Sequence, residues 1–304
     1  MNILSTLTYI YTGLANKPYL PLVMKCARVL VRKCTEVHIL KYKNCKFVPW
    51  GKTEKGLVVS FTSFPARIND VWKVVVSLKN QTVLPEKIIL WLSKDQFPSA
   101  SSIPQSLWNQ VDDLFEIQMV DGDIRSHKKH HYSLLLYPEK AFITCDDDVI
   151  YDSEMIERLV ECNRKNPNCI TANRTWKIQF SADGNAVHYN DWGPAGDPYE
   201  KKDLMQVGIG GVLYPPHCLH ELVTRKDLFM SLIPMADDIW LNCMARLKNT
   251  PVVQTKRNVV SLPIKNDSPS LFTENNGQGK NQIQLLELRK YLRENGLKDV
   301  YFNQ

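Results

Sequence analysis

Three consecutive aspartates, Asp146, Asp147 and Asp148, directly follow the apolar run from Ala141 to Cys145. Adjacent carboxylates repel one another, and burying even one of them alone is costly. A divalent cation removes that cost, because Mg²⁺ and Mn²⁺ prefer carboxylate oxygens and keep open positions for substrate phosphates. The pattern therefore predicts a cation site at a strand end. The alternative is an acidic turn that caps a helix beginning near Ser153.

A second acidic pair, Asp237 and Asp238, opens a helix-like segment that runs from Ile239 to Leu247. The N-terminus of a helix favours negative charge, so helix capping is one interpretation of the pair. The other interpretation is catalytic, because a carboxylate within hydrogen-bond reach of a hydroxyl can accept its proton. Three glycines precede the pair and either let the backbone approach a ligand or form a turn before a strand: Gly208, Gly210 and Gly211.

Further polar and aromatic residues near strand ends could contact a ligand. The first strand-like run is followed by Thr62, Ser63, Phe64 and Arg67. Lys128 and Lys129 precede the run that ends at the aspartates, and they could equally belong to a solvated basic patch, as Arg67 could be a surface arginine. Aromatic residues of a polar stretch could stack on sugar rings or pack in the core: Trp176, Tyr189, Trp192 and Tyr199. Without a matching carboxylate pattern, three histidines are interpreted as surface residues: His127, His130 and His131.

The elements that must position these residues alternate between strands and helices. Strands are predicted at 57–61, 87–92, 115–120 and 141–145, with helices between them at about 69–79, 104–114 and 126–136. Asn69 is the predicted cap of the first helix. The alternation predicts an α/β domain with a mostly parallel central sheet, helices on both faces and ligands at the carboxyl ends of strands. There is no Walker A loop and no GxGxxG turn, which argues against P-loop ATPases and dinucleotide oxidoreductases.

Several of these segments resemble one enzyme family. Ser60–Ile68 and Ser77–Gln81 resemble the first strand and helix of bacterial polysaccharide glycosyltransferases, and Asp146–Asp148 is similar to their D-x-D motif. Gly208–Pro216 and Ala236–Asn242 resemble the acceptor half of such enzymes, the latter being similar to a motif of exostosin-like transferases. The resemblance runs from residue 57 to 260 in the family's order, and it implies a single Rossmann-like domain of the GT-A type.

The resemblance, together with the chemistry above, implies a role for each candidate. A Mn²⁺ or Mg²⁺ ion would be held by Asp148 and Asp146, with Asp146 and Asp147 also contacting ribose or sugar. Asp238 would face the acceptor hydroxyl, supported by Asp237. No histidine follows His220, so the C-terminal metal-binding histidine of many GT-A enzymes is absent. Nucleotide-sugar contacts would come from Thr62, Ser63, Phe64, Arg67, Lys128 and Lys129, and acceptor or sugar contacts from Gly210, Gly211, Trp176 and Trp192.

The chain is expected to divide into three parts. Residues 1–50 form a basic helical segment, and residues 51–265 form the catalytic domain. Within this domain, the nucleotide-binding half is expected at about 56–150 and the acceptor half at about 151–265. The remainder, 266–304, is a loop and a C-terminal helix whose pattern directs Ile283, Leu286 and Leu292 toward the core.

The N-terminal segment carries much of the positive charge. The net charge of the whole chain is +6, which permits anionic partners and selects none. In a helix near residues 22–33, Lys25, Arg28 and Arg32 share one face and Leu22, Cys26, Val29, Leu30 and Lys33 share another. This pattern fits a helix on an anionic membrane surface, or a helix packed on its own domain with a solvated basic face. Eight scattered cysteines without CxxC pairs indicate free thiols, so we expect a cytoplasmic protein, peripheral to the inner membrane face in the first interpretation.

The sequence therefore predicts a hexosyl- or N-acetylhexosaminyltransferase. It would move a sugar from a nucleotide sugar, expected to be UDP-linked, to a glycan or lipid-linked acceptor in surface polysaccharide synthesis (lipopolysaccharide or capsule). One alternative is a metal-dependent phosphohydrolase, which would need a further ligand set beyond one acidic cluster. Another is a non-catalytic basic module that binds membrane or nucleic acid. The sequence has no RRM, KH or helix-turn-helix signature, so we expect no nucleic-acid partner.

Overall fold

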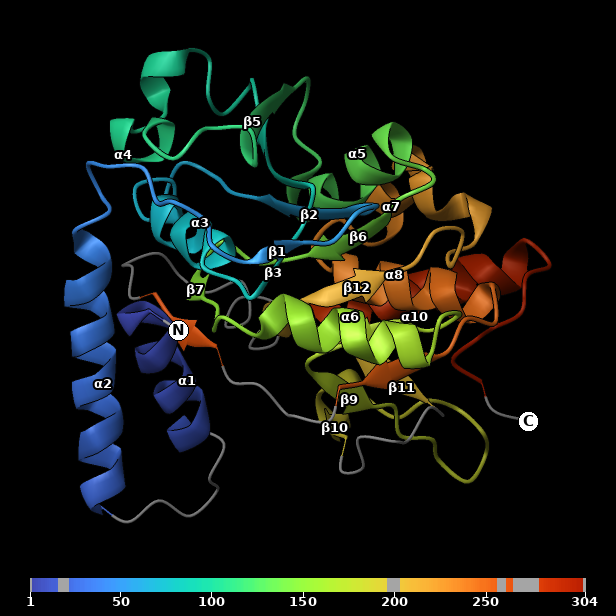
Figure 1. Ribbon diagram of the computed structural model, residues 1–304. Helices are drawn as coiled ribbons and strands as arrows, with labels where there is room; N and C mark the ends of the chain where they lie inside the picture. The colour runs from blue at the N-terminus through green and yellow to red at the C-terminus, as the bar shows by residue number, and fades with distance from the viewer. Residues whose placement is uncertain (1, 16–21, 196–202, 256–260, 265–278, 303–304) are drawn as a thin grey trace.

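The computed structural model describes residues 2–15, 22–195, 203–255, 261–264 and 279–302 (Figure 1). Its helices are α1 (Ile3–Ala15), α2 (Leu22–Leu40), α3 (Val71–Lys79), α4 (Gln105–Trp108), α5 (Lys128–Leu136), α6 (Met155–Lys165), α7 (Lys226–Leu232), α8 (Asp237–Leu247) and α10 (Lys280–Glu294). Its strands are β1 (Lys52–Thr53), β2 (Leu57–Thr62), β3 (Val83–Leu84), β4 (Lys87–Ser93), β5 (Phe115–Val120), β6 (Ala141–Thr144), β7 (Val149–Ile150), β8 (Ile170–Ala172), β9 (Thr175–Lys177), β10 (Gly193–Pro194), β11 (Leu204–Gln206), β12 (Val212–Tyr214), β13 (Val252–Gln254) and β14 (Leu262–Pro263).

Seven of these strands form the central sheet, in the order β13-β8-β12-β6-β2-β4-β5. β2 pairs in parallel with β4 and β6, β4 with β5, and β13 with β8. β12 is antiparallel to both of its neighbours, β6 and β8. The sheet is therefore mostly parallel, which confirms the predicted α/β class. The carboxyl ends of β2, β4, β6 and β8 lie at one edge, where open parallel sheets bind their ligands.

Helices cover both faces of this sheet. Successive residues of a strand point to opposite faces, so the buried side chains of one strand pack against helices on both sides. In β2, Val59 and Phe61 belong to the same buried cluster as residues of α3 and α6. Val58 points the other way, into a cluster against which Tyr132 of α5 packs. On that second face, Ser60 Oγ donates a hydrogen bond to the carbonyl oxygen of Lys129, 2.6 Å away. This bond ties the start of α5 to the central strand.

The second half of the domain has its own core around α8 and α10. β9 pairs antiparallel with β10 and β11 in a small separate sheet. Aromatic and aliphatic side chains of α8, such as Trp240 and Leu241, share a buried cluster with Leu288 of α10 and Tyr301. The phase of α10 differs from the prediction. Leu285 and Leu288 are buried beside Leu292, whereas Ile283 and Leu286 are exposed, since the apolar stripe follows the i, i+3 and i+7 positions from Leu285.

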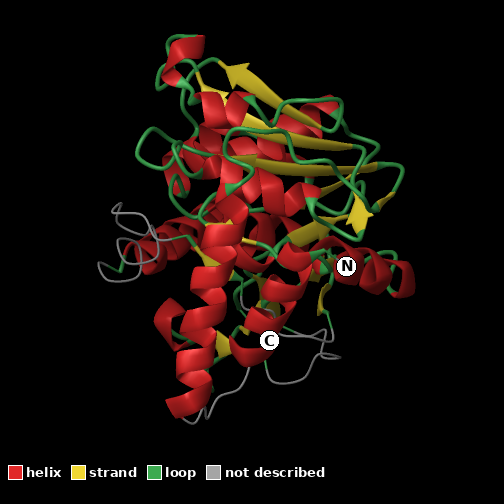
Figure 2. Cartoon of the chain, turned by 60° about the vertical axis from the view of Figure 1, so that its left-hand side comes forward, coloured by secondary structure: helices red, strands yellow, loops and turns green. Residues whose placement is uncertain are grey.

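The N-terminal segment forms a pair of helices at one side of the domain. Figures 1 and 2 show α2 along the outside of α1, which lies between α2 and the rest of the molecule. Leu4 and Tyr11 of α1 and Ile39 of α2 are buried in the same cluster as the first half of the sheet. Among the described residues, no helix has both the length and the apolar character needed to span a bilayer.

Two predicted helices also have different boundaries. α3 begins at Val71, after Asp70 and not after Asn69, and the side chain of Asp70 makes no capping hydrogen bond. The segment predicted as a helix at 104–114 is helical only over α4, because Asp112 turns the chain by accepting hydrogen bonds from the backbone of Leu114 and Phe115.

Candidate active site

A cavity of about 840 Å³ opens at the carboxyl edge of the central sheet. Its walls come from both halves of the domain. Thirteen of the residues singled out in the sequence line it: Thr62, Ser63, Phe64, Arg67, Lys128, Lys129, Asp146, Asp147, Asp148, Trp176, Tyr189, Asp237 and Asp238. The fold thus brings together residues that lie far apart in the chain.

Asp147 is the anchored member of the aspartate triplet. Ser63 Oγ donates a hydrogen bond to Asp147 Oδ2 at 2.5 Å, and Arg67 Nη1 lies 2.7 Å from Asp147 Oδ1. The same Arg67 nitrogen lies 3.0 Å from Asp148 Oδ2. Arg67 is buried, so the interpretation of it as a surface arginine is wrong. Burial raises the pKa of Asp147, and the charge of Arg67 opposes that rise. Arg67 therefore offsets part of the negative charge of Asp147 and Asp148 from inside the protein.

Asp146 and Asp148 are the members that remain partly open to the cavity. Asp148 Oδ1 is buried and accepts no hydrogen bond. Burial, together with the charge of Asp146, raises the pKa of Asp148 to about 6. An unpaired carboxylate oxygen beside a second carboxylate suits a hard divalent cation. Among the described residues, no three His, Cys, Asp or Glu side chains are placed to hold a metal together.

Lys129 connects the two acidic clusters. Its Nζ lies 2.9 Å from Asp146 Oδ1 and 3.0 Å from Asp237 Oδ2. Burial lowers the pKa of Lys129, but the carboxylates of Asp146 and Asp237 more than offset this, so the pKa is raised well above its ordinary value. Lys128 is also buried, and it pairs with Asp123. Neither lysine belongs to a solvated basic patch, because both hold carboxylates inside the domain.

The histidines of this segment are buried, so their interpretation as surface residues is wrong. His127, His130 and His131 pack around Phe229 of α7, with ring centroids 4.4, 5.6 and 5.5 Å from its ring. His127 Nε2 forms a hydrogen bond with the carbonyl oxygen of Ile233. Burial lowers the pKa of His127 to about 4 and also lowers the pKa of His130 and His131. At neutral pH these uncharged rings pack as core beneath Lys129.

Asp237 and Asp238 occupy the first turn of α8, whose N-cap residue is Ala236. Their side chains do not cap the helix. Asp238 Oδ2 accepts a hydrogen bond from the backbone N–H of Gly208 at 2.9 Å, and Asp237 pairs with Lys129. Burial and the charge of Asp237 raise the pKa of Asp238. Burial disfavours the charge of Asp237 too, but Lys129 and His127 lower its pKa. Of the two neighbours, Asp238 is therefore the better proton acceptor near neutral pH.

Three predicted sugar contacts do not line the cavity. Trp192 is only 4% exposed and lies between Tyr189 and Tyr301, with ring centroids 5.0 and 6.0 Å away, so it packs in the core. Gly211 has a φ of 83°, and a Cβ there would lie 2.8 Å from Met155 Sδ. A Cβ on Gly210 would press on Arg174 at 3.1 Å. These glycines are required by the turn and by close packing. Tyr199 lies outside the described residues.

The glycine nearest the acidic groups is Gly208. A Cβ there would lie 3.0 Å from Asp238 Oδ1 and 3.6 Å from Asp146 Oδ1. The cavity is also lined by residues that the sequence did not single out, including Arg125, Arg174 and Asn281. An isolated arginine in a polar stretch has no spacing pattern, so only the fold reveals that Arg125 and Arg174 face the same cavity as the aspartates.

Comparisons with known proteins identify no family. No protein-family description and no curated protein matches the sequence. Among solved structures, HddC from Yersinia pseudotuberculosis is 12% identical, with a TM-score of 0.39 over 70% of this chain and 93% of that one. UDP-glucose pyrophosphorylase complexed with UDP-glucose is 8% identical, with a TM-score of 0.38 over 70% and 92%. Its apo form is 9% identical, with a TM-score of 0.38 over 81% and 100%. Similarity this low carries no argument about the reaction.

Proposed function

We propose that this chain is a metal-dependent glycosyltransferase that moves a sugar from a nucleotide-sugar donor to a saccharide acceptor. One observation supports the proposal above the others. A single cavity at the carboxyl edge of the sheet contains two acidic clusters with different environments, joined through Lys129. Asp146 and Asp148 are suited to hold a cation that binds a diphosphate, and Asp238 is suited to accept the proton of a hydroxyl. Sugar transfer from a nucleoside diphosphate sugar to an alcohol can use both groups.

The proposed chemistry assigns a task to each cluster. A divalent cation held by Asp146 and Asp148 would stabilise the negative charge that develops on the leaving diphosphate. Thr62, Ser63 and Phe64, at the end of β2, border the side of the cavity where the nucleotide would lie. Asp238 would accept the proton of the acceptor hydroxyl as that oxygen attacks the anomeric carbon. Direct attack of this kind inverts the configuration. The exostosin-like motif favours retention, so the stereochemistry stays open in this proposal.

The donor is proposed to be UDP-linked, and the acceptor a glycan or lipid-linked saccharide of a surface polysaccharide. Both follow from the sequence resemblance alone. The alternative, a metal-dependent phosphohydrolase, would need a ligand set beyond one acidic cluster.

The test is a screen of UDP-glucose, UDP-galactose and UDP-N-acetylglucosamine with Mn²⁺, Mg²⁺ or excess chelator. We expect slow metal-dependent release of UDP, accelerated by a saccharide acceptor. Asp148→Asn should abolish release and leave the thermal unfolding transition in place, because it removes one cation ligand. Asp121→Asn is the matched control, since Asp121 is a highly exposed aspartate outside the cavity.

Two outcomes would contradict the proposal. The first is full activity in chelator, or an Asp148→Asn variant with normal turnover. The second is release of pyrophosphate from UTP and a sugar 1-phosphate without any sugar transfer, which would make the chain a nucleotidyltransferase. NMR of the product's anomeric proton then decides between inversion and retention.

A further inference from the structure

Arg174 is a cavity-lining cation that the reaction described above does not use. It lies between β8 and β9 and is partly buried. Arg67, Lys128 and Lys129, which also line the cavity, each pair with a carboxylate. Within the described part of the chain, the Arg174 side chain makes no hydrogen bond and no ion pair. Burial lowers the pKa of Arg174, and no neighbouring carboxylate opposes that effect. A desolvated cation without a partner is unfavourable.

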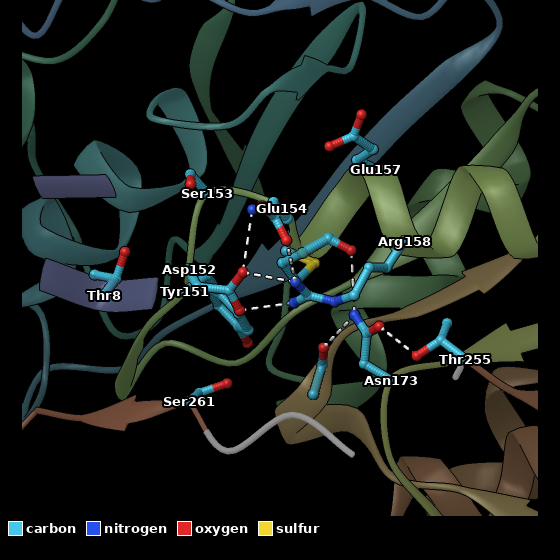
Figure 3. Close-up of polar contacts among 12 residues, drawn as sticks. Thr8, Tyr151, Asp152, Ser153, Glu154, Glu157, Arg158, Asn173, Thr255 and Ser261 are labelled. Carbon is cyan, nitrogen blue, oxygen red and sulfur yellow. Dashed lines mark hydrogen bonds and ion pairs between the residues drawn. The ribbon is translucent and has the colours of Figure 1, made fainter. Parts of the chain in front are cut away.

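The protein nevertheless holds the backbone of Arg174 firmly on both sides. Asn173 Nδ2 donates hydrogen bonds to the carbonyl oxygens of Met155 at 3.2 Å and Gly210 at 3.0 Å. Its Oδ1 accepts a hydrogen bond from Thr255 Oγ1 at 2.8 Å, and these contacts are drawn in Figure 3. On the other side, the hydroxyl of the buried Thr175 donates to Gln254 Oε1. The position of Arg174 is thus fixed by buried polar contacts while its charge is left without a partner.

The location of Arg174 indicates which part of a substrate it would meet. The proposed nucleotide side of the cavity lies at β2, whereas β8 lies on the opposite side of β6 in the sheet order. The turn from Gly208 to Gly210 packs against both Asp238 and Arg174. Its first glycine, Gly208, approaches Asp238, and Gly210 approaches Arg174. Trp176, two residues further along, also lines the cavity. Arg174 therefore lines the same cavity as Asp238 and Trp176, and its strand lies across β6 from the proposed nucleotide side.

We propose that Arg174 binds an anionic group, a carboxylate or a phosphate, on the saccharide that occupies the acceptor half of the cavity. The inference rests on the proposed function and narrows its substrate to acidic saccharides. An arginine fork can bind either anion through paired N–H donors. Trp176 would pack against the face of the same sugar ring. The anion would supply the partner that the protein itself does not provide.

The test measures binding of simple saccharides by NMR titration or calorimetry, with UDP and Mn²⁺ present. The neutral probe is methyl glucoside, and the acidic probes are methyl glucuronide and glucose 6-phosphate, which separate carboxylate from phosphate. We expect one acidic probe to bind at least about tenfold more tightly than the neutral probe, as for a charge-assisted hydrogen-bond pair. Arg174→Gln should remove this preference, and Arg174→Lys should keep part of it. Arg164→Gln, at an exposed arginine outside the cavity, is the control.

The arms of the experiment also identify the source of the anion. Comparing UDP-glucuronate with UDP-glucose tests whether the acidic group belongs to the donor sugar. The proposal is overturned if the protein prefers UDP-glucuronate to UDP-glucose but shows no preference among the free saccharides. It is also overturned if the neutral and acidic probes bind with equal affinity. An Arg174→Gln variant that weakens binding of UDP itself tenfold overturns it too, since Arg174 would then serve the diphosphate. Failure of the proposed function is a separate outcome: no UDP–Mn²⁺ binding, whatever the glycosides show.

Discussion

At the scale of single residues, two adjacent aspartates acquire different properties from their surroundings. Asp237 faces Lys129, which favours its ionised form. Burial and the charge of Asp237 raise the pKa of Asp238, although the Gly208 N–H donates a hydrogen bond to its carboxylate. When two neighbouring titratable groups have opposite pKa shifts, they usually have different roles in the chemistry. In the proposed reaction, the Asp237–Lys129 ion pair would keep the neighbouring side chains in position, and Asp238 would accept the proton.

This division predicts the behaviour of Asp238→Asn. Turnover should fall roughly a hundredfold or more, the usual scale for losing a general base, while UDP-sugar affinity stays within a few-fold. In the native enzyme, kcat/KM should fall as the pH drops through the raised pKa of Asp238, because the base must be ionised. Single-turnover kinetics across pH, beside calorimetry of donor binding, measure both effects. Lost donor binding would place Asp238 on the donor side, and a loss of only about 1 kcal/mol of stability with normal catalysis would mean a helix-terminal role.

Arg67 gives a second prediction at this scale. It is the buried cation beside Asp147 and Asp148, so Arg67→Met would leave buried carboxylates without compensation. Removing one partner of a buried ion pair costs about 3–5 kcal/mol of unfolding free energy. Urea denaturation without metal measures this loss, and the double variant Arg67→Met/Asp147→Asn should recover part of it. A single variant as stable as the native chain would show that the triplet does not depend on Arg67.

Which residues could be found from the sequence depended on whether they form a local pattern. Asp146, Asp147 and Asp148 are adjacent, so their mutual repulsion is visible without a structure. Arg174 has no such neighbour. The histidines near Lys129 were misplaced because histidine is compatible with a surface, a metal site or a core, and only packing against Phe229 decides between them. For Trp192 the sequence allows sugar stacking or core packing, and its burial beside Tyr189 and the distant Tyr301 shows core packing.

At the scale of elements, the N-terminal helix pair shows an unusual distribution of side chains. Arg28 donates hydrogen bonds to the Tyr11 hydroxyl of α1, and Arg32 pairs with Glu36. The apolar residues of α2 are instead left in solvent, with Leu22 77%, Leu30 63% and Val37 69% exposed. Lys25 and Lys33 are exposed on the same helix. A packed helix with a solvated basic face would show the opposite arrangement.

We therefore expect α2 to bind anionic membranes. Full-length protein should co-sediment with vesicles that contain phosphatidylglycerol more strongly than with neutral vesicles, and added salt should weaken the binding. Leu30→Ser/Val37→Ser should reduce binding to both kinds of vesicle, because it removes apolar contact area. Ile283→Ser is the control, since Ile283 is equally exposed but lies on α10. Equal partition to neutral and anionic vesicles would remove the support for an anionic surface.

Element types were easier to predict than element boundaries. Alternating strands and helices have distinct apolar periods, so the parallel sheet could be expected from the sequence. The phase of α10 could not, because Leu285, Leu286, Leu288 and Ile283 offer two overlapping apolar stripes. Contact with the α8 core selects the stripe that includes Leu285 and Leu288.

At the scale of the whole molecule, the cavity lies between two buried cores. One core contains β2, α3 and α6, and the other contains α8, α10 and β11. Asp146 follows Cys145 of the first core, and Asp237 lies close to Ile239 of the second. Lys129 pairs with both aspartates, so it bridges groups that depend on separate cores. Any change that loosens either core should alter the spacing between the proposed cation site and Asp238.

The helix pair belongs to the first of these cores, which bears on the predicted boundary at residue 50. Leu4, Tyr11, Ile39 and Phe47 are all buried in that core. The Phe47 N–H donates to Gln110 Oε1 at 3.1 Å, and Trp50 Nε1 donates to Asn80 Oδ1 at 2.9 Å. The described residues of this segment therefore contribute to the core around the central sheet, although the composition of the segment favours a separate unit.

This packing predicts that a chain comprising residues 51–304 does not fold stably. Burying a large apolar side chain contributes about 1.5–3 kcal/mol, so losing these four would remove roughly 6–12 kcal/mol. That amount is comparable to the whole stability of a typical domain, about 5–15 kcal/mol. Circular dichroism and urea denaturation of the truncated chain should show a lost or strongly weakened cooperative transition, whereas Leu30→Ser/Val37→Ser in the full chain should unfold as the native protein does. A truncated chain with a native transition and intact UDP-sugar hydrolysis would show that the helix pair is an appendage, and that membrane binding and catalysis can be separated by cutting the chain.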